Sequence, residues 1–182
     1  MAATLPAGNR HRPLGDEGGD LGVSPVTDGA YEVTPMAEGA VREFLGSHSV
    51  GVLGLATDGA PSLRPMSFWF DGEEHLYMLY VLGPDSRKAA LSERDDPARF
   101  LVYSAETPFS WRSVLVTGQL RDVPEEEADS VREPLKEVWR PEAFRAVVEH
   151  GETAVYELAV EDWTGLESSG LPPGFEPADG SE

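Results

Sequence analysis

The sequence predicts a mainly β protein, a small six-stranded antiparallel β-barrel with a few helices as decoration. Six short runs rich in β-branched and aromatic residues are bounded by turn signals, and most connections between them are short. Strand and helix patterns do not alternate along the chain, which argues against a doubly wound sheet that binds a dinucleotide. With 182 residues, the chain is long enough to bury one core without metal or disulfide staples.

The first half of the predicted domain contains one helix and three strands. The helix is expected to begin at Thr34, with Pro35 at its first position, and to run to Gly46. Apolar and β-branched residues then dominate three runs, and Asp58-Gly59, a strong hairpin signal, joins the first two. The three strands are expected over 49–57, 62–70 and 75–82.

The second half contains three more expected strands and further helices. The strands are expected over 99–106, 111–123 and 152–163, and helices over 86–95 and 141–150. Asp85 or Ser86 would start the first of these helices. Another helix is expected to begin at Glu125 to Glu127, because negative charge is favoured at a helix N-terminus. Pro134 is expected to break or kink that helix.

Composition separates the expected domain, residues 31–166, from two tails. Residues 1–30 contain six Gly, three Pro and no aromatic residue. Such a segment cannot bury enough apolar surface to offset the entropy lost on ordering, so a flexible tail is expected. Residues 167–182 are rich in Gly, Pro and Ser and are expected to be irregular.

The charge balance excludes some partners and suggests a habitat. The chain has 33 Asp and Glu against 14 Lys and Arg, a formal charge of −19, so its field repels nucleic acid phosphates. No run is apolar enough to span a membrane, no secretory signal is present, and there is no cysteine, so a soluble cytoplasmic protein is expected. An acidic surplus with only two lysines is expected for a protein kept soluble in concentrated salt, and an acidic mesophile protein is the alternative.

The placement of the scarce positive charge is the most informative feature for function. Arg64 lies in the middle of an otherwise apolar run, where an unpaired charge is costly. Ser86, Arg87 and Lys88 follow a strand and open a helix, whose first N–H groups favour an anion. These residues are expected to form a phosphate clamp, although the glycine-rich phosphate loops of other folds are absent from the sequence. The alternative is that the three cations pair with nearby carboxylates.

Four segments, in their order and spacing, resemble the pyridoxamine 5′-phosphate oxidase-like family of FMN-binding split β-barrels. They are LATDGAPSLRPMSFWF, LYMLYVLGPDSRKAAL, DDPARFLVYS and WRSVLVTGQLRDV, the last followed by an acidic helix start. The resemblance extends from about Met36 to Trp163. It implies a homodimer in which FMN lies in a groove between the two chains.

The same resemblance implies roles for individual residues. Arg64 falls where the family places a phosphate-binding arginine, and Met66 and Ser67 fall where the chain meets the edge of the flavin ring. Trp111 and the following Arg112-Ser113 correspond to a segment that reaches the flavin from the other subunit. The full implied set is Arg64, Pro65, Met66, Ser67, Tyr80, Val81, Ser86, Arg87, Lys88, Trp111 and Ser113.

Departures from the family pattern argue against the true vitamin oxidase. That enzyme has a second lysine where this chain has Trp69, a threonine in place of Tyr80 and a glutamine in place of Ser113. Its C-terminal arginine-containing strand has no counterpart in LESSGLPPGFEPADGSE. The chain is more similar to the branch that includes nitroimidazole-resistance-like reductases and deazaflavin-dependent relatives.

The leading functional hypothesis is a homodimeric FMN-binding oxidoreductase that acts on an unidentified small molecule, with no general acid or base nominated. A non-catalytic flavin carrier or redox-sensing module is one alternative. A deazaflavin-dependent reductase is another, and it would need a basic path, for which Arg94 and Arg99 are the nearby candidates. A haem-binding variant of the barrel would need His48 or His75 as an axial ligand.

Overall fold

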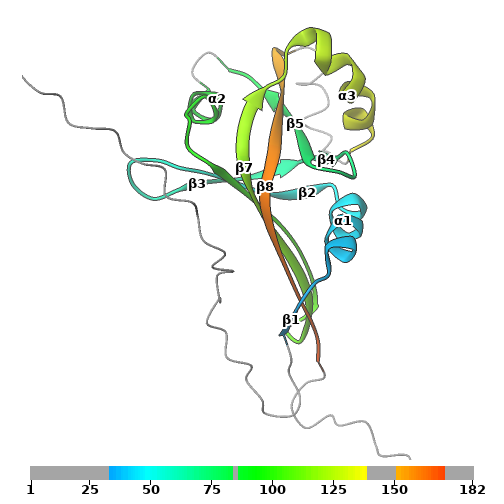
Figure 1. Cartoon of the computed structure of the whole chain (residues 1–182). Helices are drawn as coiled ribbons and strands as arrows, with labels where there is room; N and C mark the ends of the chain where they lie inside the picture. Colours follow the sequence, from blue (N-terminus) through cyan, green and yellow to red (C-terminus); the bar gives the residue numbers. More distant parts are fainter. Residues whose placement is uncertain (1–32, 84–85, 139–150, 171–182) are drawn as a thin grey trace, which may run out of the picture.

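One antiparallel sheet of eight strands is the framework of the structure (Figure 1). The computed structural model describes residues 33–83, 86–138 and 151–170. The elements are β1 (Val33–Pro35), α1 (Glu38–Ser47), β2 (Val50–Leu55), β3 (Ser62–Ser67), β4 (Trp69–Phe70), β5 (His75–Val81), α2 (Arg87–Ser92), β6 (Ala98–Thr107), β7 (Ser110–Asp122), α3 (Glu125–Glu137) and β8 (Thr153–Ser169). The strand order is β3-β2-β6-β7-β8-β5-β4, and β1 pairs with β8. The prediction of a mainly antiparallel β protein with few helices is confirmed.

The expected strand over 62–70 is interrupted, and the interruption closes the sheet. β3 pairs with β2, whereas β4 pairs with β5 at the other end of the strand order. Phe68 lies between them, fully buried, with its ring 5.0 Å from the ring of Phe100 in an edge-on arrangement. The chain therefore changes partner strand at Phe68, so that the two ends of the sheet are covalently continuous, as in a split barrel.

The N-terminal part of the helix prediction is wrong. Thr34 and Pro35 belong to β1, which pairs with Glu167 and Leu166 of β8, and α1 begins only at Glu38. Proline lacks an N–H but is tolerated on an edge strand, because one side of such a strand has no ladder to complete. Pairing with β8 therefore prevails over the local helix-start signal.

Strand β8 is longer than the sequence indicates. It continues through Ser169, so the first three residues of the tail expected over 167–182 are strand. Strands that are distant in sequence hold this segment in the sheet, because β7 pairs with one of its edges and β1 with the other. Ser168, for example, lies opposite both Trp111 and Val33. The expected tail over 1–30 and the expected helix over 141–150 lie outside the described residues.

Helix α3 contains Pro134 and runs three residues beyond it, so of the expected break or kink the break is wrong. Ala128, Val131 and Leu135 are buried on the face of the helix that packs against Val155 of β8. This packing holds the helix through the proline, whose missing hydrogen bond falls in the last turn. A second and larger apolar cluster fills the barrel between β2, β5, β6, β7, β8 and α1.

Candidate functional site

The positive residues of the structure fall into two groups. Arg42, Arg94, Arg121, Arg132 and Lys136 form ion pairs with carboxylates. No carboxylate of the described residues pairs with Arg64, Arg87 or Lys88, or with Arg99 and Arg112, although the chain carries a formal charge of −19. The described residues therefore do not support the alternative that the three cations Arg64, Arg87 and Lys88 only pair with neighbouring carboxylates.

Lys88 is held in a half-buried position by β3, β5 and α2. Ser86 caps α2, its hydroxyl accepting a hydrogen bond from the Ala89 N–H at 3.4 Å. The Lys88 Nζ lies 3.8 Å from the sulfur of Met66 and 3.8 Å from the centroid of the Tyr80 ring. Burial, and next the positive charge of Arg64, lower the Lys88 pKa to about 8. A nearby anion would offset both effects, so this environment favours an anionic ligand.

Tyr80 forms a rigid support beneath Lys88. Its ring is fully buried and stacks on Tyr156, with 4.0 Å between ring centroids. Its hydroxyl is 2.9 Å from the hydroxyl of Ser92, which donates a hydrogen bond to the backbone carbonyl of Lys88 at 2.9 Å. Burial raises the Tyr80 pKa to about 12, so the phenol stays neutral. Lys88 and Tyr156 both lie against the Tyr80 ring. Tyr80 therefore supports a ligand indirectly, by holding Lys88 in place, and does not stack on the ligand itself.

The register of β3 divides the predicted flavin-binding element between two faces of the sheet. Arg64 lies opposite the buried Leu53, and Met66 lies opposite Gly51, so both are on the face that carries the barrel core. Pro65 and Ser67 point to the other face, because successive residues of a strand alternate. Beyond the break at Phe68, the ring of Trp69 stacks on Tyr77 and packs against the apolar cluster under α3.

The remaining predicted residues of this part lie beside the end of β5. Val81 is half-buried at the end of the strand, opposite Thr153. Arg87 is exposed, and with Ser86 it lines a hollow of about 610 Å³ next to the start of α2. Arg64, Met66, Tyr80, Val81, Ser86, Arg87 and Lys88 thus come from β3, β5 and α2 around one end of the barrel.

Trp111, Arg112 and Ser113 are not part of that assembly. They lie near the tip of the β6–β7 hairpin, which extends away from α2 (Figure 1). Trp111 and Ser113 pair with Ala105 and Tyr103, beyond the part of β6 that pairs with β2. Arg112 points to the opposite face, where its guanidinium lies 5.2 Å from the centroid of the Phe44 ring. One chain therefore does not bring these residues to Lys88.

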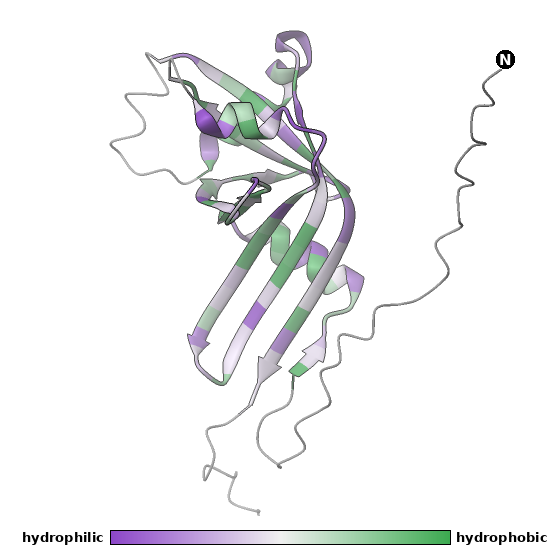
Figure 2. Cartoon of the chain, turned by 90° about the vertical axis from the view of Figure 1, so that its left-hand side faces the viewer, coloured by the Kyte–Doolittle hydropathy of each residue, from purple (hydrophilic) through white to green (hydrophobic). Residues whose placement is uncertain are grey.

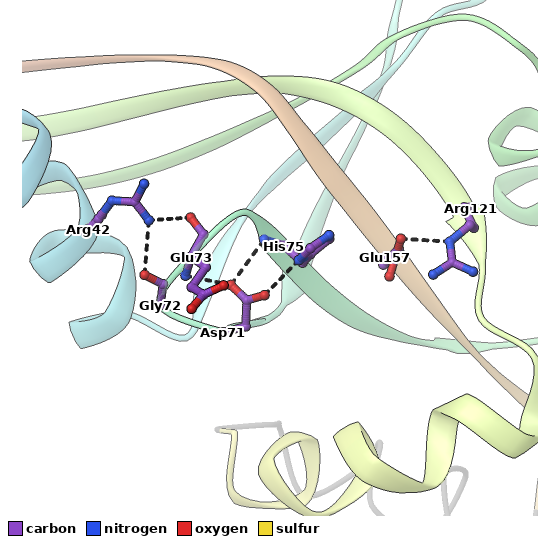
Figure 3. A network of polar contacts seen from close by, with 7 residues as sticks. All are labelled: Arg42, Asp71, Gly72, Glu73, His75, Arg121 and Glu157. Atoms are coloured by element: carbon purple, nitrogen blue, oxygen red, sulfur yellow. Dashed lines mark hydrogen bonds and ion pairs between the residues drawn. The ribbon is translucent and has the colours of Figure 1, made fainter.

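A polar network that the sequence analysis missed fixes the β4–β5 turn (Figure 3). One carboxylate oxygen of Asp71 accepts hydrogen bonds from the N–H groups of Glu73 and His75, and the other lies 2.7 Å from His75 Nδ1. Burial would raise the Asp71 pKa, but these hydrogen bonds outweigh it and lower the pKa. Arg42 of α1 donates to the carbonyls of Gly72 and Glu73. The network joins α1 to the turn and has a structural role.

A buried carboxylate, also missed, lies on β8 at the other end of the same view (Figure 3). Glu157 is 5% exposed and accepts a hydrogen bond from Arg121 Nε at 2.7 Å. Burial, followed by the charge of Glu157, raises the pKa of the neighbouring Tyr77. Arg121 also pairs with Glu127 of α3, so the pair fastens the helix to the sheet. The signal in the sequence is a single charge inside the apolar run TAVYELAV.

The described part of the chain contains neither a metal-binding cluster nor a membrane-spanning helix. No three His, Asp or Glu side chains there converge as they would around a metal ion. Likewise, none of the helices described is both long and apolar enough to cross a membrane.

The fold and a large part of the sequence match known proteins. The family model described as pyridoxamine 5′-phosphate oxidase matches residues 37–167, which is more than half of the chain. No curated protein sequence matches significantly.

Several solved structures share the fold. A FAD-binding protein from Mesorhizobium loti is 23% identical with a TM-score of 0.58, over 75% of this chain and 99% of that one. A FAD and heme binding protein from Mycobacterium smegmatis is 17% identical with a TM-score of 0.60, over 81% and 77% of the two chains. A candidate 5-nitroimidazole antibiotic resistance protein from Bacteroides thetaiotaomicron is 15% identical with a TM-score of 0.54, over 75% and 87%.

Proposed function

Because this chain belongs to the pyridoxamine 5′-phosphate oxidase family, we propose that it is a homodimeric flavin-binding oxidoreductase that holds the phosphate of FMN with Arg64 and Lys88. The observation that carries the proposal is the pair of adjacent cations without a carboxylate partner among the described residues, in a chain with a formal charge of −19. Solved structures with the same fold include proteins named for FAD binding.

The chemistry of the two cations suits a phosphate. A guanidinium offers two parallel N–H donors to phosphate oxygens, and an ammonium adds a compact point charge. A dianion beside Lys88 would restore its positive form and offset the cost of its partial burial. Ser86 and the exposed Arg87 lie at the start of the same helix and would complete the phosphate contacts. Met66 would meet the edge of the flavin ring.

A second copy of the chain is proposed to complete the site. The sheet face that carries Ser67, Tyr103, Trp111 and Ser113 has no described helix over it, and in Figure 2 it faces the viewer with α1 behind the sheet. Register places no carboxylate of β2, β3 or β7 on this face, and the neighbouring β8 contributes the exposed Asp162, opposite Thr117. Val50, Leu63 and Tyr103 are 41%, 59% and 61% exposed there. A face with exposed apolar side chains and few carboxylates in so acidic a chain fits a second copy with the same face.

Such a dimer would bring Trp111 and Ser113 of one chain to the phosphate residues of the other. When bound, the flavin would supply hydride transfer. The residues of the chain would bind the phosphate, orient the ring and exclude water from it.

The deazaflavin alternative is less well supported, because carboxylates neutralise one of the two arginines of the basic path that it needs. Arg94 pairs with Asp58 at 3.3 Å and with Asp96 at 2.8 Å. Arg99 lies on the opposite face of β6 from the barrel core, opposite Gly54. A flavin carrier without catalysis remains the alternative that the experiment below separates from an enzyme.

The test is to purify the protein in molar salt, record the visible spectrum and identify by mass the ligand that acid releases. We expect a flavin spectrum and FMN near one per chain, with turnover of an artificial acceptor by NADH or NADPH. Release of FAD would show that the cofactor is FAD and not FMN. A bound flavin without turnover would favour the non-catalytic flavin carrier. Protein that is colourless and takes up no added flavin would refute the proposal.

Variants locate the phosphate contacts. Replacing Arg64 and Lys88 together by Ala should abolish flavin retention. The matched control is Lys136→Ala, which removes an exposed lysine paired with Glu133 and should retain flavin fully. Full flavin occupancy in the double variant would refute the assignment of the clamp.

A further inference from the structure

Lys88 differs from the other lysine of the chain in the features that control how an amine reacts. The chain has two lysines, Lys88 and Lys136. Lys136 is exposed and forms an ion pair with Glu133, whereas Lys88 is half-buried and no carboxylate of the described residues pairs with it. An ammonium held by a carboxylate keeps its proton, and a protonated nitrogen has no lone pair with which to attack a carbon atom. The two lysines therefore form a matched pair within one molecule.

The surroundings of Lys88 Nζ favour the neutral amine. The nitrogen lies 3.8 Å from the thioether sulfur of Met66 and 3.8 Å from the centroid of the Tyr80 ring. A thioether and the face of a ring hold an ammonium less strongly than a carboxylate does. Burial of the side chain, and next the positive charge of Arg64, act in the same direction and lower the Lys88 pKa to about 8. Desolvation beside a second cation is one way in which proteins make a lysine nucleophilic.

The amine is also held in a fixed position. Lys88 lies in the first turn of α2, where its backbone carbonyl accepts a hydrogen bond from the Ser92 hydroxyl at 2.9 Å. That hydroxyl lies 2.9 Å from the hydroxyl of Tyr80, whose ring lies against Nζ and stacks on Tyr156. Because the backbone and the ring are both fixed, the nitrogen meets a ligand with little further loss of side-chain entropy.

The neighbouring Arg64 selects the class of compound that reaches this amine. Arg64 is exposed, its guanidinium donates to the carbonyl of the adjacent Leu63 at 3.3 Å, and no carboxylate of the described residues pairs with it. A guanidinium has several N–H donors, so most of them are available to an anion. Burial is the larger cause of the lowered Lys88 pKa, so an anion on Arg64 leaves much of that effect in place.

We propose that Lys88 is a covalent binding site for small anionic aldehydes, whose anionic group is held by Arg64 while the carbonyl group reacts with Lys88 Nζ. The nitrogen lone pair attacks the carbonyl carbon, and a C–N bond forms. The carbonyl oxygen then leaves as water with the two hydrogens of the amine, and an imine remains. No electrons are transferred, so the step needs no oxidant or reductant. The site shares residues with the proposed phosphate clamp, but its chemistry does not rest on flavin binding.

The experiment compares the two lysines in the same molecules. The full chain, freed of any bound flavin, is treated at pH 7.5 with glyoxylate or with the uncharged aldehyde propanal. Cyanoborohydride is present to reduce each imine to a stable amine, and peptide mass mapping gives the labelling rate of each lysine. We expect glyoxylate to label Lys88 at least about tenfold faster than Lys136, because a pKa near 8 leaves an appreciable fraction of the Lys88 amine neutral at this pH.

The role of Arg64 is tested by the ratio of Lys88 to Lys136 labelling, which cancels the different reactivities of the two aldehydes. This ratio should be at least about fivefold higher for glyoxylate than for propanal, because Arg64 attracts the carboxylate. Arg64→Gln should remove the difference. The matched control is Arg94→Gln, which alters an exposed arginine paired with Asp58 and Asp96 and should retain the difference.

Two results would overturn the proposal. They are equal labelling of Lys88 and Lys136 by glyoxylate, and a preference for glyoxylate that persists in Arg64→Gln. Thermal unfolding verifies that each variant is folded. Added FMN should slow the labelling of Lys88 if its phosphate binds there. Fast labelling that FMN does not slow would support this site and refute the phosphate clamp, so the two proposals can fail separately.

Discussion

Replacing Lys88 by Met should make the flavin-free protein more stable while it impairs the proposed ligand site. Lys88 is half-buried beside Arg64, Met66 and Tyr80, and no carboxylate of the described residues pairs with it, so its charge destabilises the folded state. A fall of the pKa from 10.5 to about 8 corresponds to roughly 3 kcal/mol for a fully enclosed group. Because solvent still reaches Lys88, screening reduces this, and we expect about 1 to 2 kcal/mol of stabilisation at pH 7. Methionine fills similar space without charge.

The sign of the pH dependence distinguishes this account from simple repacking. Below pH 8, lysine is protonated in both folded and unfolded chains, so the whole destabilisation is present. Between pH 8 and 10.5, the folded chain releases its proton before the unfolded one does, so wild-type stability rises relative to the variant. The advantage of Lys88→Met should therefore be smaller at pH 9.5 than at pH 7.

Urea unfolding of the flavin-free protein in fixed molar salt, at pH 7 and pH 9.5, measures both quantities. The control is Lys136→Met, which alters an exposed lysine paired with Glu133 and should change stability little at either pH. A destabilised Lys88→Met protein, or an advantage that does not depend on pH, would refute the reasoning. Flavin or phosphate affinity of the same variant should fall at least tenfold.

Three further predictions concern packing, assembly and salt. Gly118→Ala should destabilise the protein by more than about 2 kcal/mol in urea unfolding, because a Cβ at this position would lie 1.9 Å from the carbonyl oxygen of Ala159 at the β7–β8 bulge. The matched control is Gly59→Ala, where a Cβ would meet no other atom. Tyr103→Glu should convert the proposed dimer to a monomer in sedimentation, and a monomeric wild-type protein would contradict this assembly. The unfolding midpoint should rise steeply from low to molar KCl, and a flat response would exclude the salt-loving interpretation.

Local sequence patterns alone predict most of the strands, the turns between them and the identity of the scarce cations. Alternating patterns and strong turn signals such as Asp58-Gly59 depend on a few neighbouring residues, and the structure has a β2–β3 hairpin there. Arg64 and Lys88 were identifiable because so few positive residues occur in this chain, and the fold brings them to the same end of the barrel.

The features that depend on distant partners follow from tertiary contacts instead. Pairing with β8 makes Thr34 and Pro35 a strand, and packing on Val155 carries α3 past Pro134. The role of Tyr80 as a support for Lys88 arises where β5, β8 and α2 meet. Local sequence encodes backbone preference within a few residues. Burial and the pairing of charges are set by segments far apart in the chain, which meet only when the sheet closes.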